Sequence, residues 1–199
     1  LISPFCRYGS LESFLQVGKP NNEIVPRPEK LLLRITRDAA AGLQHLHLEH
    51  VIHRDIALRN VLVGDQFSVY VTDFGMSRLR DVNQDYGQTK SSLGPVKNMA
   101  PEAVLDKKYS EKSDVWSFGV MMWQMETRKP LYSNLDPLSV VVAITNKTLP
   151  KLEPPNWTNP TNRALIEQCL QLNPKDRPTM AQIYQKLHTS YFMMDGPDC

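Results

Sequence analysis

The sequence predicts one mostly helical α+β domain that carries a short β-hairpin near its middle. Apolar residues recur with the 3.6-residue period of a helix over residues 29–50 and again in four segments after Pro101. Two β-branched runs, 60–63 and 68–71, are separated by four residues, which is typical of a hairpin. The chain has 199 residues, of which 41% are hydrophobic and 22% charged. These values are normal for one folded domain and exclude a disordered or collagen-like chain.

The other elements follow in chain order. Ser10 is a typical helix cap, and the apolar residues after it predict a short helix. Three prolines and two asparagines over 18–28 predict an exposed loop. Glycines and prolines are scattered over 73–102, so we expect little regular structure there, and loops of this length are usually functional. The four later helical patterns cover 115–126, 138–146, 163–172 and 180–193.

Charge and cysteine content exclude several classes of function. The net charge is +2, too small to indicate a nucleic-acid or membrane-surface partner. The longest stretch without a charged residue, 115–125, is well short of the ~20 apolar residues that cross a bilayer. Three widely spaced cysteines form no CxxC motif, which fits a reducing compartment and argues against a disulfide framework or a cysteine zinc site. The first residues lack an initiator Met and a signal peptide, so we expect the chain to begin within a longer sequence.

Polar residues on both sides of the predicted hairpin carry the chemical signal. The segment His53-Arg54-Asp55 with Asn60 precedes the first strand, and Asp73-Phe74-Gly75 follows the second. This pair resembles the catalytic loop, H-R-D-x-x-x-x-N, and the magnesium loop, D-F-G, of eukaryotic protein kinases. Three further motifs occur in the family's order: Ala100-Pro101-Glu102, the segment 114–119 and Arg177-Pro178. Five ordered motifs are much stronger evidence than a lone DFG.

The resemblance implies a protein-kinase-like fold, of which this chain holds the hinge (1–9) and the helical C-terminal lobe (10–199). The activation segment would be 73–102. The glycine-rich loop, the strand lysine and the helix glutamate of the family belong upstream of Leu1. We therefore expect the β-rich N-terminal lobe to be absent from the chain and encoded upstream. The isolated chain should bind ATP weakly and turn over little.

The resemblance also assigns roles in phosphoryl transfer. Asp55 would accept the proton of the substrate hydroxyl, and Arg59 would contact the transition state. Asn60 and Asp73 would hold Mg²⁺, which prefers hard oxygen ligands. The residues expected to bind ATP are Pro4 and Cys6 through their backbone, Ser10, Leu62 against the adenine, and the two magnesium ligands, Asn60 and Asp73.

Residues near Asp55 favour tyrosine as the phosphate acceptor. Serine/threonine kinases usually carry Lys two residues after the catalytic Asp, whereas this chain has Ala57 there and Arg59 two residues later. This arrangement is similar to the tyrosine-kinase pattern H-R-D-L-A-A-R-N. A guanidinium at this place can reach the γ-phosphate region, and the small Ala57 leaves room for a phenol ring.

A second segment also resembles tyrosine kinases. Pro95, Val96 and Lys97 match the start of P-V-K-W-M-A-P-E, which forms a floor for the substrate tyrosine. Asn98 stands where that pattern has Trp, so we expect a looser floor.

Regulatory and supporting roles follow from the same resemblance. Tyr86 is the only tyrosine between Asp73 and Glu102, and its phosphorylated form would order the loop through Arg54. His53 would be a packing and backbone-bonding residue, Asp114 would hold the catalytic-loop backbone, and Glu102 would form a buried ion pair with Arg177. We interpret the remaining histidines of the long helix, His45, His47 and His50, as residues suited to the dipole at its end.

Two alternatives stay open. One is a dual-specificity or serine/threonine kinase of the tyrosine-kinase-like group, and the other is a catalytically inactive pseudokinase or interaction module. The partners expected are ATP, Mg²⁺, a protein substrate that presents tyrosine and the upstream lobe, with no nucleic acid and no membrane span in this chain. Since the chemistry needs cytosolic ATP, the lobe should be cytoplasmic or should face the cytoplasm from a membrane receptor.

Overall fold

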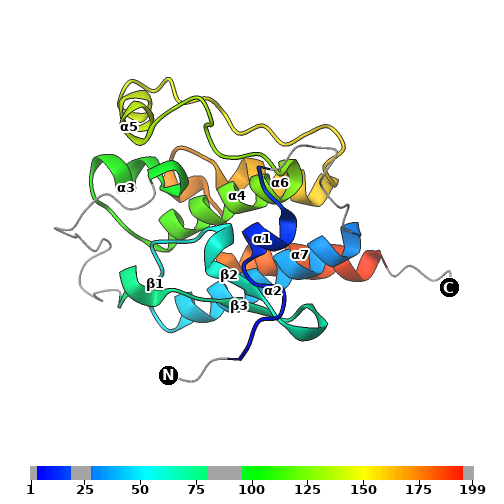
Figure 1. The fold of residues 1–199 in the computed structure, drawn as a ribbon. Coiled ribbons are helices and arrows are strands. Elements are labelled where there is room, and N and C mark those ends of the chain that lie inside the picture. The colour runs from blue at the N-terminus through cyan, green and yellow to red at the C-terminus, as the bar shows by residue number, and fades with distance from the viewer. Residues whose placement is uncertain (1–3, 19–27, 80–95, 195–199) are drawn as a thin grey trace.

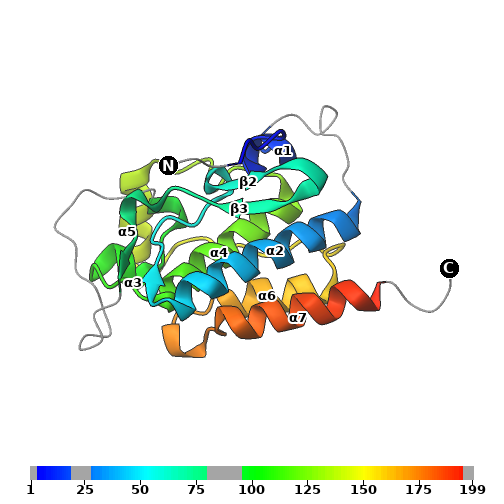
Figure 2. The same cartoon turned by 90° about the horizontal axis from the view of Figure 1, so that it is seen from below.

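The structure, a computed structural model, describes residues 4–18, 28–79 and 96–194. Its helical base contains four longer helices: α2 (Glu29–Leu48), α4 (Glu111–Thr127), α6 (Pro160–Cys169) and α7 (Met180–Met193). Figure 2 shows α2 and α4 in the middle, with α6 and α7 on one side and the hairpin with α1 on the other. Figures 1 and 2 both place α3 (Pro101–Leu105) and α5 (Pro137–Thr145) at one end of the lobe. The predicted fold class, α+β with a mostly helical lobe, is confirmed.

Helix α4 is the central element because it packs against two apolar clusters. Its Phe118 and Met121 join the larger cluster with α2, α6 and α7, whereas Trp116 and Val120 join the smaller one with α5. A helix that is apolar on every side is typically buried, and twelve of the seventeen residues of α4 are buried here. Gly119 permits close contact with α6, because a Cβ at this position would lie 2.5 Å from the Cβ of Cys169.

The β-hairpin lies where the sequence predicts it. Strand β2 (Val61–Val63) pairs antiparallel with β3 (Val69–Val71), with Val61 opposite Val71 and Val63 opposite Val69. The connection covers 64–68 and contains a 3₁₀ turn, η3 (Asp65–Phe67), so it is one residue longer than predicted. Ser68 remains in the turn because its N–H and its Oγ both bond to the Asp65 carbonyl.

The expectation of little regular structure over 73–102 was partly wrong. Strand β4 (Arg78–Leu79) pairs with β1 (Val51–Ile52) in a second small sheet, and 3₁₀ turns form at η4 (Phe74–Met76) and η5 (Val96–Asn98). Helix α3 begins at Pro101. Elements of two or three residues show no periodicity, and β4 exists because β1, 26 to 28 residues earlier, pairs with it.

The predicted helices are all present, with limits that differ by up to four residues. Helix α1 (Leu11–Leu15) is capped by Ser10, whose side chain accepts a hydrogen bond from the Ser13 N–H. Helix α4 begins four residues before the predicted limit because Ser110 and Ser113 form a reciprocal capping box. No helix within the described residues is long and apolar enough to cross a membrane.

Candidate active site

Asp55 lies at the centre of a hydrogen-bonded group in the loop between β1 and β2. The Asn60 side chain donates from Nδ2 to the Asp55 carbonyl and to its Oδ2, both at 2.8 Å. The guanidinium of Arg59 contacts the other carboxylate oxygen, Oδ1. Asp55 is buried, whereas about two fifths of the Arg59 side chain is exposed. The loop therefore fixes the orientation of the carboxylate and leaves the guanidinium facing solvent.

A carboxylate of α4 holds the backbone just before Asp55. Asp114 Oδ2 accepts from the His53 N–H at 2.8 Å, and Asp114 Oδ1 accepts from the Arg54 N–H at 2.9 Å. Arg54 has a φ of 69°, a left-handed conformation that is unfavourable for a residue with a side chain. The two hydrogen bonds offset that cost and so determine the direction in which the chain reaches Asp55.

The ring of His53 connects Asp55 to the end of β3. Its Nδ1 accepts from the Asp55 N–H at 3.3 Å, and its Nε2 lies 3.0 Å from the Thr72 carbonyl. A carbonyl can only accept, so these partners assign the proton to Nε2 of a neutral imidazole. His53 is fully buried and also packs on the Phe74 ring, with 5.4 Å between ring centroids. Its contacts are those of a positioning residue.

Asn60 and Asp73 lie at adjacent ends of the β2–β3 hairpin. The Asn60 carbonyl accepts from the Thr72 N–H at 2.9 Å and from its hydroxyl at 3.1 Å. The next residue, Asp73, is exposed in a left-handed conformation, and its Oδ1 accepts from the Gly75 N–H at 3.3 Å. Because Asn60 donates through Nδ2, its Oδ1 is left to act as a ligand together with the Asp73 carboxylate.

This donor set fits Mg²⁺. The two residues supply hard amide and carboxylate oxygens, and Mg²⁺ is usually held by few protein ligands together with water and phosphate oxygens. Across 4–18, 28–79 and 96–194, no three His, Cys, Asp or Glu side chains gather as a metal cluster. A cation held by Asn60 and Asp73 could take its remaining ligands from water and from a nucleotide.

The hinge residues lie along β2. The Tyr8 N–H donates to the Val63 carbonyl at 3.0 Å, and Ser10 forms a β-bridge with Leu62. The Cys6 carbonyl accepts from the Gly9 N–H, whereas the Cys6 N–H bonds to none of the described residues. Leu62 is half-buried, and Pro4 is exposed. The structure thus brings these four predicted ATP contacts to one region, although the Ser10 hydroxyl is engaged as the cap of α1.

The predicted substrate floor is described from Val96 onward. Val96 is buried, and the Lys97 ammonium donates to the Tyr132 carbonyl at 3.1 Å. Asn98 is buried, and its carbonyl accepts from the Ser117 hydroxyl at 2.8 Å. Two predicted residues, Pro95 and Tyr86, lie outside the described residues.

The ion pair predicted between Glu102 and Arg177 is present. Arg177 donates from Nη1 and Nη2 to the two Glu102 carboxylate oxygens, at 2.6 and 2.9 Å. The Arg177 side chain is fully buried and donates to three further carbonyls, those of Lys112, Gln171 and Leu172. The pair therefore joins α3 to the start of α4 and to the segment before α7.

Positive charge gathers beside the catalytic loop. Arg54 lies over the Tyr109 ring, 4.8 Å from its centroid. Burial lowers the pKa of the Arg54 guanidinium, and repulsion from Arg78 lowers it further. An anion placed here would relieve that repulsion.

One supporting contact was not foreseen from the sequence. His47 lies in the last turn of α2, as expected, but its side chain is only 8% exposed and its Nε2 lies 3.0 Å from Asp114 Oδ2, the oxygen that also accepts from the His53 N–H. It therefore orients the carboxylate that holds the catalytic loop, which the helix-dipole interpretation did not foresee. The local sequence contains no signal for this role, since the partner is 67 residues away.

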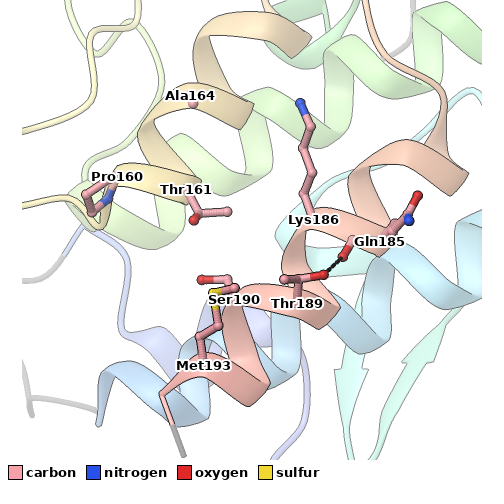
Figure 3. A pocket seen from close by; sticks show the side chains of 8 residues that line it. All are labelled: Pro160, Thr161, Ala164, Gln185, Lys186, Thr189, Ser190 and Met193. Atoms are coloured by element: carbon pink, nitrogen blue, oxygen red, sulfur yellow. Dashed lines mark hydrogen bonds between the residues drawn. The ribbon is translucent and has the colours of Figure 1, made fainter. Parts of the chain in front are cut away.

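A groove on another part of the lobe lies away from these residues. It has a volume of about 580 Å³ between α6 and α7, and Figure 3 shows Thr161 and Ala164 on one side and Ser190 and Met193 on the other. It contains no residue of the catalytic loop. The candidate site is therefore the convergence of Asp55, Arg59, Asn60 and Asp73 around the hairpin.

Comparisons with known proteins agree with this geometry. The family model for protein tyrosine and serine/threonine kinases matches residues 1–187. The chain is 35% identical over 189 residues to the serine/threonine-protein kinase CTR1 of Arabidopsis thaliana, covering 94% of this chain and 22% of that protein. It is 35% identical to the tyrosine-protein kinase transforming protein Abl of Abelson murine leukemia virus, covering 96% of this chain and 25% of that protein.

A third relative is a receptor. The chain is 33% identical to the high affinity nerve growth factor receptor of Rattus norvegicus, over 94% of this chain and 24% of the receptor. The chain thus spans a quarter or less of the length of these three relatives. The family model covers nearly the whole chain, and on that ground the chain belongs to the protein tyrosine and serine/threonine kinase family.

Proposed function

We propose that the chain is the C-terminal lobe and hinge of an ATP-dependent protein kinase that transfers the γ-phosphoryl group of ATP to a tyrosine hydroxyl. The observation that carries this proposal is the contact between the Arg59 guanidinium and the Asp55 carboxylate. It places a cation beside the proposed base from four residues further along the loop. The neighbouring Ala57 is small and buried and cannot supply that charge.

Each residue of the site has a defined task in this proposal. Asp55 orients the acceptor hydroxyl and accepts its proton as the oxygen attacks phosphorus. Arg59 stabilises the negative charge that spreads over the transferring group. Asn60 and Asp73 are the residues that would hold Mg²⁺, and the bound ion would neutralise charge on the phosphates.

The nucleotide would lie against the hinge and β2, which are hydrogen-bonded to each other. The Pro4 carbonyl and the Cys6 N–H are the backbone groups proposed for the adenine edge, and Leu62 offers an apolar surface to its face. These assignments rest on the hinge lying along β2 through the Tyr8–Val63 hydrogen bond. Ser10 is retained in the proposed ATP set through its backbone, since its hydroxyl caps α1.

The domain limits and cellular setting complete the proposal. The hinge is 1–9, the lobe is 10–199, and the activation segment is 73–102. A β-rich lobe with a glycine-rich loop, a lysine and a glutamate would be encoded upstream. Since the reaction consumes cytosolic ATP, we propose that the lobe faces the cytoplasm.

Serine or threonine is the second candidate acceptor. It is favoured by the 35% identity to the serine/threonine-protein kinase CTR1, which equals the identity to the Abl tyrosine kinase. The third candidate is an inactive interaction module. The presence of Asp55, Asn60 and Asp73 in bonded positions speaks against it.

Phosphoamino-acid analysis tests the proposal on the longer protein that carries this chain. The protein should label tyrosine in a mixed peptide pool, and Asp55→Asn should lower the rate by about 10²–10⁴-fold through loss of the base. Asp65→Asn, an exposed aspartate of the hairpin turn, is the matched control and should leave the rate unchanged. Labelling of serine or threonine would support the second candidate, and no labelling by the unaltered protein would support the third.

Regulation through Tyr86 is part of the same proposal. A phosphate on Tyr86 would be bound by Arg54, which lies beside a second cation, Arg78. Active protein should carry phosphotyrosine at this position by mass spectrometry, and Tyr86→Phe should reduce the rate. An undiminished rate in that variant would refute this role.

A further inference from the structure

A second buried polar cluster lies at the C-terminal end of α4 and takes no part in the proposed reaction. Asn162, at the start of α6, donates from Nδ2 to Glu126 Oε1 at 2.8 Å. Asn162 is only 5% exposed, and Glu126 is half-buried. The bond therefore joins two helices that pack closely along their lengths.

The cluster contains two buried polar groups without a hydrogen-bond partner among the residues that the structure describes. Among the described residues, neither the Asn162 Oδ1 nor the Thr158 hydroxyl makes a hydrogen bond of normal geometry. Thr158 is only 4% exposed, and its hydroxyl lies near enough to Glu126 to lower the pKa of that carboxyl. A buried acceptor without a donor is costly, so a proton that reached Asn162 Oδ1 would be stabilising.

Burial, hydrogen bonding and two charged groups act on the Glu126 carboxyl. Burial raises the pKa of the Glu126 carboxyl, and Glu29 at the start of α2 raises it further. The Asn162 hydrogen bond and the Arg128 guanidinium act in the opposite direction. Glu29 itself accepts from Asn159 Nδ2 at 3.0 Å, and Arg128 donates to the Leu15 carbonyl at 2.9 Å.

We propose that Glu126 and Asn162 form a proton-dependent clasp between α4 and α6. In its closed form the carboxyl proton of Glu126 is donated to Asn162 Oδ1, while Asn162 Nδ2 donates to Glu126 Oε1. The acid and the amide then satisfy each other through two hydrogen bonds, as their complementary donors and acceptors allow. Loss of the proton removes one of these bonds and leaves a charged carboxylate in a desolvated place.

The clasp makes the stability of the lobe depend on pH in one direction. A group whose pKa is raised by folding stabilises the folded chain below its unfolded pKa, and this contribution is lost as pH rises through the folded pKa. The ordinary glutamate value is 4.5. The clasp should therefore contribute fully to the stability of the folded chain below pH 4.5, and this contribution should decline as the pH rises.

Thermal melting of the whole chain and its Glu126→Gln variant tests the clasp. A glutamine can donate to Asn162 Oδ1 at every pH, so the variant should melt several degrees above the unaltered chain at about pH 8. The difference should shrink toward zero as the pH is lowered below 4.5, the ordinary glutamate value, where Glu126 is protonated. Glu167→Gln, at an exposed position of α6, is the matched control and should show a difference that does not vary with pH.

Two results would overturn the proposal. One is a melting difference for Glu126→Gln that stays constant between the two pH values. The other comes from NMR of the unaltered chain and applies even if the variant fails to fold. The Glu126 carboxyl carbon should titrate above 4.5, and the Asn162 carboxamide carbon should shift with the same midpoint. A midpoint at or below 4.5, or an Asn162 signal that does not follow it, would refute the clasp.

Discussion

Helix α4 carries a carboxyl group near each end, Asp114 fully buried and Glu126 half-buried, and the two groups have different surroundings. Near the N-terminal end, the oxygens of Asp114 accept from the backbone of His53 and Arg54 and lie against the His47 ring. Near the C-terminal end, Glu126 accepts at 2.8 Å from Asn162, whose own oxygen has no donor among the described residues. The same helix therefore carries Asp114, whose carboxylate has three hydrogen-bond partners, and Glu126, which lies beside an acceptor that has none among the described residues.

The difference shows how one element can serve both as a support and as a pH-sensitive contact. Asp114 acts only as an acceptor, and each of its hydrogen bonds fixes part of the loop that carries Asp55. The neighbours of Glu126 include Asn162 Oδ1, a buried acceptor without a partner among the described residues, which a protonated carboxyl group could satisfy. Burial alone does not determine the role of a carboxyl group, because the donors and acceptors around it decide which protonation state fits.

The largest expected effect concerns the ion pair beside the N-terminal end of α4. Glu102→Gln leaves the buried Arg177 guanidinium without a charged partner and should destabilise the chain by about 3–5 kcal/mol. Urea unfolding followed by circular dichroism measures this free energy. Asp106→Asn is the matched control, since Asp106 lies 3.3 Å from Lys108 in an exposed pair that should contribute less than about 1 kcal/mol. Equal effects of the two substitutions would contradict a special role for the buried pair.

The next effect tests whether His47 supports the catalytic loop through Asp114. His47→Leu removes a donor from a buried carboxylate and should cost about 1–3 kcal/mol. Hydrogen exchange should become faster at the His53 and Arg54 amides, which bond to Asp114, and should stay unchanged at the Val63 amide, which bonds to Gly9.

His47→Gln is the control for this prediction, because its amide can still donate to the carboxylate. It should restore much of the protection at the two loop amides. Equal loss in both variants would mean that the shape of the imidazole matters and that its hydrogen bond does not. Unchanged exchange in His47→Leu would show that the two backbone hydrogen bonds alone hold Asp114.

The sequence predicts contacts made by motifs better than contacts made across the fold by isolated residues. The 3.6-residue period predicted α2 and α7 closely, and the β-branched runs predicted the hairpin, because local patterns produce these elements. The Glu102–Arg177 pair was predicted from the family resemblance and is present. The short sheet of β1 and β4 has no period of its own, so only the folded chain shows it.

The candidate site shows the same distinction. Asp55, Asn60 and Asp73 were named from motifs, and the structure brings them together around the hairpin. His47 and the Glu126–Asn162 bond were not foreseen, because their partners lie 67 and 36 residues away. Histidine, glutamate and asparagine on helices usually face solvent, so the sequence gives no signal that these three residues make contacts inside the fold.

The smallest effect concerns the middle of α4, between the two carboxyl groups. Gly119→Ala places a Cβ 2.5 Å from the Cβ of Cys169, which is part of a neighbouring helix and cannot rotate away. Overpacking costs about 1–3 kcal/mol, and alanine regains about 1 kcal/mol of helix propensity, so a net loss of about 1 kcal/mol is expected. Gly42→Ala in α2 is the matched control, since its nearest neighbour is a methyl group of Val71 at 3.1 Å, which can shift by a few tenths of an ångström. Gly42→Ala should leave the free energy of unfolding in urea nearly unchanged. A Gly119→Ala variant more stable than the unaltered chain would mean that α4 and α6 can separate without cost. The Glu126–Asn162 contact would then not depend on close packing of the two helices.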